Sequence, residues 1–242
     1  MKVLKFGGTS VGSAQRMKDV AKLIVGEKNL IVLSAMSGTT NSLVEISDYL
    51  YKKNPDGANE IINKLSQKYF GHIDELYATE EYKEKARELV TFHFDHIRSF
   101  TKDLFTLFEE KVVLAQGELI STGMMNLYLQ EQGVNSVLLP ALDFMRTDKN
   151  AEPDPVYIKE KLNRLLEENA GADLYITQGY ICRNAYGEID NLQRGGSDYT
   201  ASLIGAAIKA EEIQIWTDID GMHNNDPRFV KGTSPVRHLH FE

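Results

Sequence analysis

Short apolar runs alternate along this chain with longer segments that have helical spacing. The runs are rich in β-branched and aliphatic residues and cover residues 2–6, 30–34, 136–139, 174–178 and 213–217. Continuous apolar runs of this length are typical of strands buried on both faces, as in a parallel sheet. Strands separated by helices predict right-handed βαβ units. The sequence therefore indicates an α/β fold around a mostly parallel sheet.

Helices are expected between these runs. The first two are indicated by apolar residues three or four positions apart: Met17, Val20, Ala21 and Ile24, then Leu43, Ile46 and Leu50. Thr40 or Asn41 is expected to cap the second helix. Residues 56–110 are charged and lack a strand pattern, so we interpret them as a helical insertion packed on one edge of the sheet. A further helix is expected over residues 111–131, and a polar hairpin near residues 184–190.

The overall charge and the cysteine content exclude several classes of protein. The net charge is −8 over 242 residues, and the one cysteine is Cys182. A negative chain lacks the surplus of clustered Lys and Arg that a broad nucleic-acid surface requires. One cysteine excludes an internal disulfide and fits a reducing compartment, and no stretch approaches the roughly 20 apolar residues that span a bilayer. We expect a cytoplasmic protein that binds neither nucleic acid nor membrane.

The first apolar run leads directly into a glycine turn, with Lys5 followed by Gly7, Gly8, Thr9 and Ser10. Adjacent glycines let the backbone approach a ligand closely, because no Cβ is in the way. Backbone N–H groups at the start of a following helix favour an anion, usually a phosphate. Lys5 adds a positive charge just before the turn. A phosphate site is one interpretation, and a tight turn without a ligand is the other.

A second glycine turn, Arg194-Gly195-Gly196-Ser197-Asp198, precedes a helix of small residues. Ser197 is a natural N-cap for this helix, and Asp198 complements the positive end of the helix dipole. A capped helix without a ligand satisfies both of these roles. Arg194 favours a binding site instead, since its guanidinium is a planar fork for a carboxylate or a phosphate.

Two more polar segments follow apolar runs. Residues 34–40 end in Thr40, and residues 215–221 contain Thr217 and Asp218. Both segments are expected at the carboxyl ends of strands, where open α/β sheets bind their ligands. A plain turn remains the alternative for each, and the acidic residues of the second segment lack the spacing of a calcium-binding loop.

Isolated polar residues carry weaker signals. Glu118 follows Gly117 in an expected helix, where a lone glutamate is usually solvated surface. His93 and His96 have helical spacing that can suit a metal ion, although packed or solvated histidines are the favoured interpretation. Cys182 has no activating partner in the sequence, so we expect it to be inert.

In their order along the chain, these segments resemble aspartate kinase, within the amino acid kinase superfamily. The motifs that carry the resemblance are Lys-Phe-Gly-Gly-Thr-Ser-Val at 5–11, Gly-Glu at 117–118, Arg-Gly-Gly-Ser-Asp at 194–198, Trp-Thr-Asp-Ile-Asp-Gly at 216–221 and Asp-Pro-Arg at 226–228. The resemblance implies an α/β/α sandwich with a sheet of about eight strands. It also implies transfer of the γ-phosphoryl group of ATP, with Mg²⁺, to the side-chain carboxylate of L-aspartate. The product would be 4-phospho-L-aspartate, on the way to lysine, threonine and methionine.

The resemblance further implies roles for single residues. Lys5 would hold the phosphates, and Asp198 would organise Lys5 and the reacting centre. Arg194 would bind the α-carboxylate of aspartate and Glu118 would face its ammonium group, with Thr40 and Ser197 nearby. The nucleotide would be held by Lys5, Gly7, Gly8, Thr9, Ser10, Thr217, Asp218, His223 and Arg228. No residue is assigned to a metal ion.

Two positions and the length depart from the family's pattern. Gln193 stands where a glycine is usual, and His223 stands where an aromatic residue, often tyrosine, packs near the nucleotide. The family's catalytic domain continues for roughly another fifty residues. Regulatory modules normally follow it, and a homoserine dehydrogenase follows in bifunctional members. We interpret residues 1–242 as one amino acid kinase domain shortened at its C-terminal end, from a parent that forms a homo-oligomer.

Two other functions stay open at this point. A sister amino acid kinase would use another acceptor, such as glutamate, acetylglutamate or a nucleotide. A binding fragment would hold nucleotide and amino acid without turnover. A dinucleotide-dependent dehydrogenase is less favoured, because no Gly-x-Gly-x-x-Gly follows the first apolar run.

Overall fold

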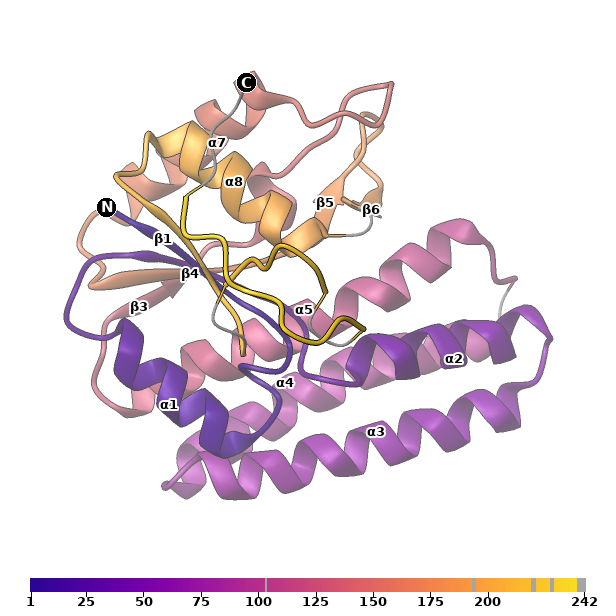
Figure 1. Cartoon of the computed structure of the whole chain (residues 1–242). Coiled ribbons are helices and arrows are strands. Elements are labelled where there is room, and N and C mark those ends of the chain that lie inside the picture. The colour runs from indigo at the N-terminus through magenta and orange to yellow at the C-terminus, as the bar shows by residue number, and fades with distance from the viewer. Residues whose placement is uncertain (103, 193–194, 219–220, 227–228, 239–242) are drawn as a thin grey trace.

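The computed structural model describes residues 1–102, 104–192, 195–218, 221–226 and 229–238. The strands are β1 (Val3–Phe6), β2 (Leu30–Leu33), β3 (Ser136–Leu138), β4 (Leu174–Gln178), β5 (Ile181–Arg183), β6 (Ile189–Asn191) and β7 (Ile213–Trp216). The helices are α1 (Ala14–Ile24), α2 (Thr39–Tyr51), α3 (Pro55–Leu76), α4 (Glu80–Ser99), the short 3₁₀ helix η1 (Phe100–Lys102), α5 (Leu107–Glu131), α6 (Ala141–Phe144), α7 (Pro155–Glu168) and α8 (Gly196–Ile208). Figure 1 shows their arrangement.

The five apolar runs form one sheet, as predicted. Its strand order is β3-β4-β2-β1-β7 and every neighbouring pair is parallel. In the described residues this sheet has five strands, and β5 and β6 pair with each other as a separate antiparallel ribbon. That ribbon confirms the predicted polar hairpin. Because β1 lies between β2 and β7, the loops that follow these three strands meet at one edge of the sheet.

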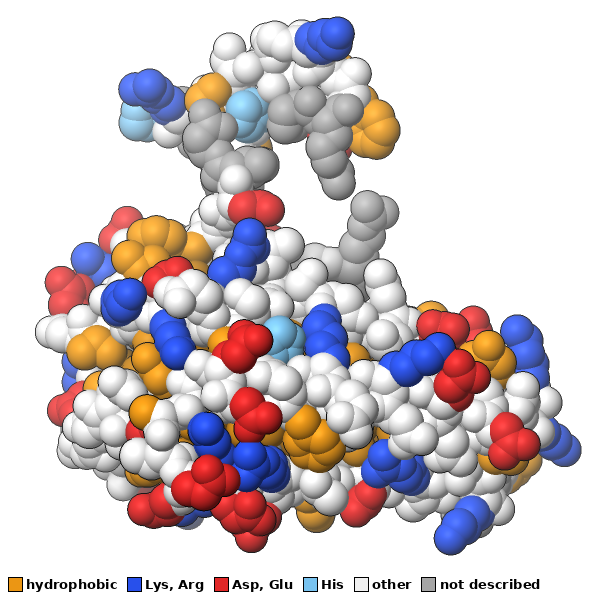
Figure 2. All heavy atoms as spheres, turned by 90° about the horizontal axis from the view of Figure 1, so that it is seen from below, with side chains coloured by type: hydrophobic (Ala, Val, Ile, Leu, Met, Phe, Trp, Pro, Cys, Tyr) orange, Lys and Arg blue, Asp and Glu red, His pale blue; other side chains and the backbone are white. Residues whose placement is uncertain are grey.

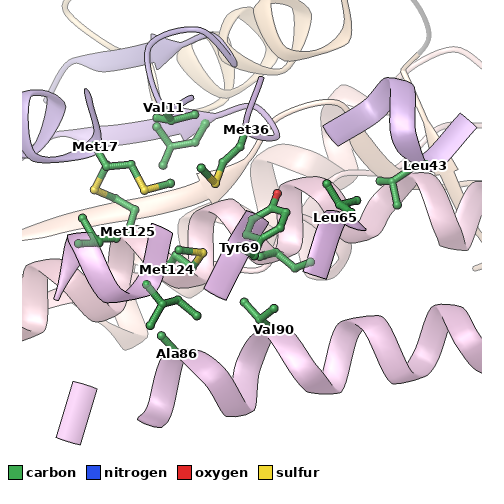
Figure 3. Packing of buried hydrophobic residues seen from close by; sticks show 14 of the residues in the cluster. Val11, Met17, Met36, Leu43, Leu65, Tyr69, Ala86, Val90, Met124 and Met125 are labelled. Atoms are coloured by element: carbon green, nitrogen blue, oxygen red, sulfur yellow. The ribbon is translucent and has the colours of Figure 1, made fainter. Parts of the chain in front are cut away.

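Helices cover both faces of the sheet and give the expected three-layer α/β/α sandwich (Figure 1). Alternate residues of a strand point to opposite faces, so Leu4 and Phe6 of β1 pack with the α1–α5 side while Val3 packs with α7 and α8. Figure 3 shows the larger of the two cores, where Tyr69 lies among methionine and leucine side chains. Strands β1, β2 and β4 are therefore buried on both faces, which explains their continuous apolar runs. The edge strand β7 is largely exposed, so the expected burial on both faces is wrong for this strand.

Helices α3 and α4 form an outer layer on one side of the molecule. They pack against each other and against α1, α2 and α5, so the expected packing on an edge of the sheet is wrong. The reason lies in α5, which is buried nearly all round its middle turns and needs apolar partners on the side away from the sheet. Figure 2 shows this side of the molecule from below, with basic and acidic side chains interspersed. Among the helices that the structure describes, none combines the length and the apolar character of a membrane span.

The helix starts differ from the caps expected from sequence. α2 begins at Thr39, one residue before the predicted cap, and Gly38 occupies the cap position with φ +82°. Thr39 is the first residue of the helix, and its hydroxyl oxygen is buried 2.8 Å from the Tyr69 hydroxyl oxygen. At the start of α5, Thr106 and Glu109 form a capping box.

Candidate active site

The loops after β1 and β2 are held together at the carboxyl edge of the sheet. The Ser37 N–H donates to the Gly8 carbonyl at 3.0 Å, and the Ser34 N–H donates to the Phe6 carbonyl at 3.2 Å. A Cβ at Gly8 would lie 2.7 Å from the Ala35 carbonyl oxygen, closer than real side chains come. This position requires glycine because the two backbones touch there.

A cavity of about 800 Å³ opens beside these loops. Seven of the residues predicted from sequence line it: Lys5, Gly8, Thr9, Thr40, Glu118, Ser197 and Asp198. They come from β1, the loop after β1, the first turn of α2, the middle of α5 and the first turn of α8. Segments far apart in the sequence therefore meet at the carboxyl edge of the sheet, as the strand order requires.

Lys5 and Asp198 form an ion pair at the wall of this cavity. Lys5 Nζ lies 2.7 Å from Asp198 Oδ1, and the two side chains are 13% and 54% exposed. Asp198 lies in the first turn of α8, where the helix dipole also favours a negative charge. The pair fixes the position of a cation whose surroundings are largely shielded from water.

Ser197 joins the start of α8 to the loop after β2. Its Oγ hydrogen-bonds with Ser34 Oγ at 2.9 Å, and Ser121 Oγ donates to the Ser34 carbonyl at 2.8 Å. The prediction that Ser197 caps α8 is wrong, because the helix begins at Gly196 and Gly195 occupies the cap position. The hydroxyl of Ser197 is thereby left for the cavity instead of the helix end.

Glu118 is buried inside α5, only 4% exposed. Its Oε1 accepts the Ala35 N–H at 3.2 Å, whereas its Oε2 has no hydrogen-bond partner. Burial raises the pKa of Glu118 to about 8, although the Ala35 N–H opposes this rise. The expectation that a lone helical glutamate is solvated surface does not hold here. A buried carboxyl group with an unpartnered oxygen at a cavity wall is suited to a cationic group of a ligand.

Sequence reasoning missed several other residues of the cavity wall. On α5, Lys111 lies two turns before Glu118 on the same face, and its Nζ pairs with Asp190 Oδ1 of β6 at 3.0 Å. After β4, Tyr180 has φ +69°, and burial together with Glu118 raises its pKa to about 12. The seven-residue spacing between Lys111 and Glu118, two turns of one expected helix, was the signal in the sequence that could have found Lys111.

The amino acid kinase family model matches residues 1–242, the whole chain. This match decides the family. The chain belongs to the amino acid kinase family.

Curated aspartokinases are among the relatives of this amino acid kinase. Lysine-sensitive aspartokinase 3 of Escherichia coli strain K12 is 31% identical over 99% of this chain and 54% of its own length. The aspartokinase of Chlamydia trachomatis serovar D is 32% identical, over 99% of this chain and again 54% of its own length. The chain spans about half the length of the curated relatives it matches.

A solved structure supports the fold of this family member. The crystal structure of E. coli aspartokinase III in complex with aspartate and ADP superposes with a TM-score of 0.85 at 30% identity. The match covers 98% of this chain and 53% of that one. The α/β/α architecture of the amino acid kinase family is therefore confirmed.

Other predicted site residues of this amino acid kinase do not line the cavity. Gly7 lies next to Lys5, since a Cβ on it would be 3.5 Å from Lys5 Nζ, and the Ser10 N–H donates to the Gly7 carbonyl. The others follow β7: Thr217 Oγ1 lies 3.3 Å from Asp218 Oδ1, and His223 Nδ1 lies 2.9 Å from Thr233 Oγ1. Arg194 and Arg228 lie outside the described residues, so their roles stay predictions.

The metal and thiol alternatives gain little support from the described residues. Within them, no three His, Cys, Asp or Glu side chains are grouped so that they can hold a metal ion. His93 is buried with its Nδ1 2.7 Å from Gln116 Oε1, a packed histidine as favoured from sequence. Cys182 is buried, and burial raises the pKa of its thiol to about 12, so it is not an activated nucleophile.

Proposed function

We propose that this amino acid kinase is an aspartate kinase, which transfers the γ-phosphoryl group of MgATP to the side-chain carboxylate of L-aspartate. The aspartokinase relatives match it over nearly its whole length. The E. coli structure that resembles it holds aspartate and ADP. The carboxyl edge of the sheet carries residues suited to both substrates.

The observation that carries the proposal is the unpartnered Oε2 of buried Glu118 in the same cavity as Lys5. An amino acid acceptor brings an ammonium group, which can satisfy that oxygen. A ligand without a cationic group would leave the carboxyl group unpaired, which costs free energy. The cavity therefore favours an amino acid over a simple carboxylate, and the phosphates have a cation in Lys5.

The chemistry needs no strong general base. The side-chain carboxylate of aspartate has an ordinary pKa of about 3.9, so it is already ionised at neutral pH. One of its oxygens attacks the γ-phosphorus, the bond from that phosphorus to the bridging oxygen breaks, and ADP leaves. Lys5 neutralises charge on the phosphoryl group as it moves, and the site holds the reactants in line. Asp198 keeps the Lys5 ammonium in place.

Mg²⁺ enters this proposal with ATP, as part of the substrate. Protein sites for this ion usually supply one or two carboxylates and leave the remaining positions to phosphates and water. Asp198 is half exposed at the cavity wall, so the residues present fit a magnesium ion carried by the phosphates. Thr217, Asp218, His223 and Arg228 would hold the rest of the nucleotide, and Arg194 the α-carboxylate of aspartate.

The cellular setting is part of the same proposal. The reaction would be a first step towards lysine, threonine and methionine, in the cytoplasm, where a buried free thiol such as Cys182 stays reduced. The protein would act as a homo-oligomer. Neither nucleic acid nor membrane is proposed as a partner.

The test is phosphoryl transfer measured by two readouts. ADP release is followed with ATP, Mg²⁺ and L-aspartate, with L-glutamate and no acceptor as controls. Hydroxylamine then traps an acyl phosphate as a hydroxamate, which separates transfer from ATP hydrolysis. Aspartate-dependent ADP release and hydroxamate formation are expected. Transfer to glutamate in preference to aspartate would instead establish a sister kinase, and calorimetric binding of both substrates without turnover would establish a binding protein.

A further inference from the structure

Lys111 and Asp190 form the ion pair best shielded from water in the described part of the chain. Lys111 Nζ lies 3.0 Å from Asp190 Oδ1, with side chains 24% and 28% exposed. Every other ion pair between described residues has at least one side chain more than half exposed. Solvent screens a partly buried pair less than a surface pair, so removal of either charge leaves the other without a partner in a partly shielded place.

The pair connects two elements that build the cavity. Lys111 lies on α5, which also carries Glu118, and Asp190 lies on β6. Asp190 Oδ1 also accepts the N–H of Asn191 at 2.8 Å. Lys111 and Asn191 both line the cavity. The ion pair therefore holds β6 at a fixed place along α5, beside the cavity whose wall contains the unpartnered Oε2 of Glu118.

Hydrogen bonds extend this connection to the start of α8. The Leu192 N–H donates to the Tyr180 carbonyl at 2.8 Å, and the Tyr180 N–H donates to Thr200 Oγ1 at 3.0 Å. The Thr200 hydroxyl in turn donates to the Gly196 carbonyl at 2.7 Å. β6 is thereby linked to the turn of helix that supplies Ser197 and Asp198.

We propose that Lys111 and Asp190 are positioning residues for the acceptor substrate, an inference that rests on the proposed function. The pair acts as a clasp that holds the acceptor wall, which we define as Lys111, Leu114, Glu118, Tyr180 and Asn191. When the clasp is open, β6 moves relative to α5, and Asn191 and Tyr180 move relative to Glu118. The acceptor then binds more weakly, whereas Lys5 keeps its place because it lies on β1 between β2 and β7, strands that the ion pair does not contact.

The kinetic test uses Lys111→Met and Asp190→Asn, which keep side-chain size and remove one charge each. We expect the KM for aspartate to rise about tenfold in both variants, with kcat within about twofold and the KM for ATP unchanged. The double exchange of Lys111→Asp with Asp190→Lys should restore the KM for aspartate to within about threefold of wild type. If Lys111 acted only by attracting the negative acceptor, Asp190→Asn would lower that KM; this outcome, or an unchanged KM in both variants, overturns the clasp.

A second test does not depend on turnover. Hydrogen–deuterium exchange of peptides that cover residues 181–192 should become faster in both single variants and return towards wild type in the exchanged pair. Arg87→Met is the matched control, because it breaks an ion pair with Asp74 between α3 and α4 that lies away from the cavity. Unchanged exchange in Lys111→Met and Asp190→Asn would overturn the clasp. Faster exchange in a protein without aspartate-dependent turnover would overturn the proposed function and keep the clasp as a structural contact.

Discussion

Folding removes the carboxyl group of Glu118 from water and satisfies one of its two oxygens. The sequence could not show this, because burial depends on which helix face the loop after β2 covers. The same limit applies to Ser197, whose residue type favours an N-cap, although in the structure its hydroxyl meets Ser34. The place of Lys5 at the cavity was predictable because a strand, a cation and two glycines occur in one short segment; its catalytic role stays a prediction. Single residues on long helices carried no comparable pattern.

The raised pKa of Glu118 predicts a pH-dependent stability. Its pKa is about 8 in the folded protein against a usual value of 4.5, so between these pH values the unfolded chain loses a proton that the folded chain keeps. The free energy of unfolding therefore falls as pH rises through this window, by up to about 1.4 kcal/mol per pH unit from this group. Glu118→Gln lacks the effect, so its unfolding free energy minus that of wild type should rise from pH 4.5 to 8 and then level off.

Urea unfolding at a series of pH values measures this difference. Glu45→Gln, at an exposed position of α2, is the matched control. A difference between Glu118→Gln and wild type that does not change with pH would contradict the prediction. Aspartate binding gives a second measurement. The ammonium group of aspartate pairs with ionised Glu118, so the affinity of the wild-type protein for aspartate should rise with pH up to about 8. Glu118→Gln should not show this rise.

Replacement of Lys5 should affect turnover more than substrate binding. In Lys5→Met, we expect kcat for aspartate-dependent ADP release to fall at least about 100-fold, because the cation stabilises charge that develops in the transition state. The KM for aspartate should stay within about threefold. Lys18→Met is the control, since Lys18 binds the Glu75 carbonyl and does not line the cavity. Turnover at the wild-type rate in Lys5→Met would remove Lys5 from the reacting centre.

At the scale of elements, the strands were predictable and the packing of α3 and α4 was not. Each strand is a run of residues that suits a buried parallel sheet, so the signal is local. Where α3 and α4 pack is decided by the apolar surface of α5 that faces away from the sheet. That surface is a property of the assembled layers, because α5 is apolar around most of its circumference and shows no single stripe.

The contact between α5 and the loop after β2 predicts opposite outcomes for two glycine substitutions. A Cβ at Gly117 of α5 would lie 2.8 Å from the Ala35 Cβ, whereas a Cβ at Gly71 of α3 meets nothing within 4 Å. Gly117→Ala should lower the free energy of unfolding by about 1–3 kcal/mol, because two packed backbones must separate. Gly71→Ala should raise it by about 0.5–1 kcal/mol, because alanine is the better helix former.

Urea unfolding of both variants measures whether the free energy of unfolding falls in Gly117→Ala and rises in Gly71→Ala. Steady-state kinetics of Gly117→Ala measure the effect on aspartate binding. Separation of α5 from Ala35 moves Glu118, which accepts the Ala35 N–H, so the KM for aspartate should rise in Gly117→Ala and stay unchanged in Gly71→Ala. Equal stability effects from the two substitutions would show that the close approach at Gly117 relaxes without cost.

Across the whole molecule, the strand order places the proposed parts of the reaction in a row. β1 lies between β2 and β7 and all three are parallel. Lys5 therefore lies between the first turn of α2, which carries Thr40 and follows β2, and the end of the strand that precedes Asp218. The acceptor would bind on the β2 side and the nucleotide on the β7 side, with the phosphoryl group passing over β1. A linear order of this kind would let motifs that are distant in the sequence serve the one proposed reaction.

This order predicts that the two substrates can be weakened separately. Thr40→Val should raise the KM for aspartate about tenfold and leave that for ATP unchanged, and Asp218→Ala should do the reverse. Because the two positions lie on opposite sides of β1, the double variant should show the sum of the two changes in ln(kcat/KM) for each substrate. Steady-state kinetics with each substrate varied in turn measure the four constants. A rise in both KM values from either single substitution would place the substrates in one shared pocket, not on two sides of Lys5.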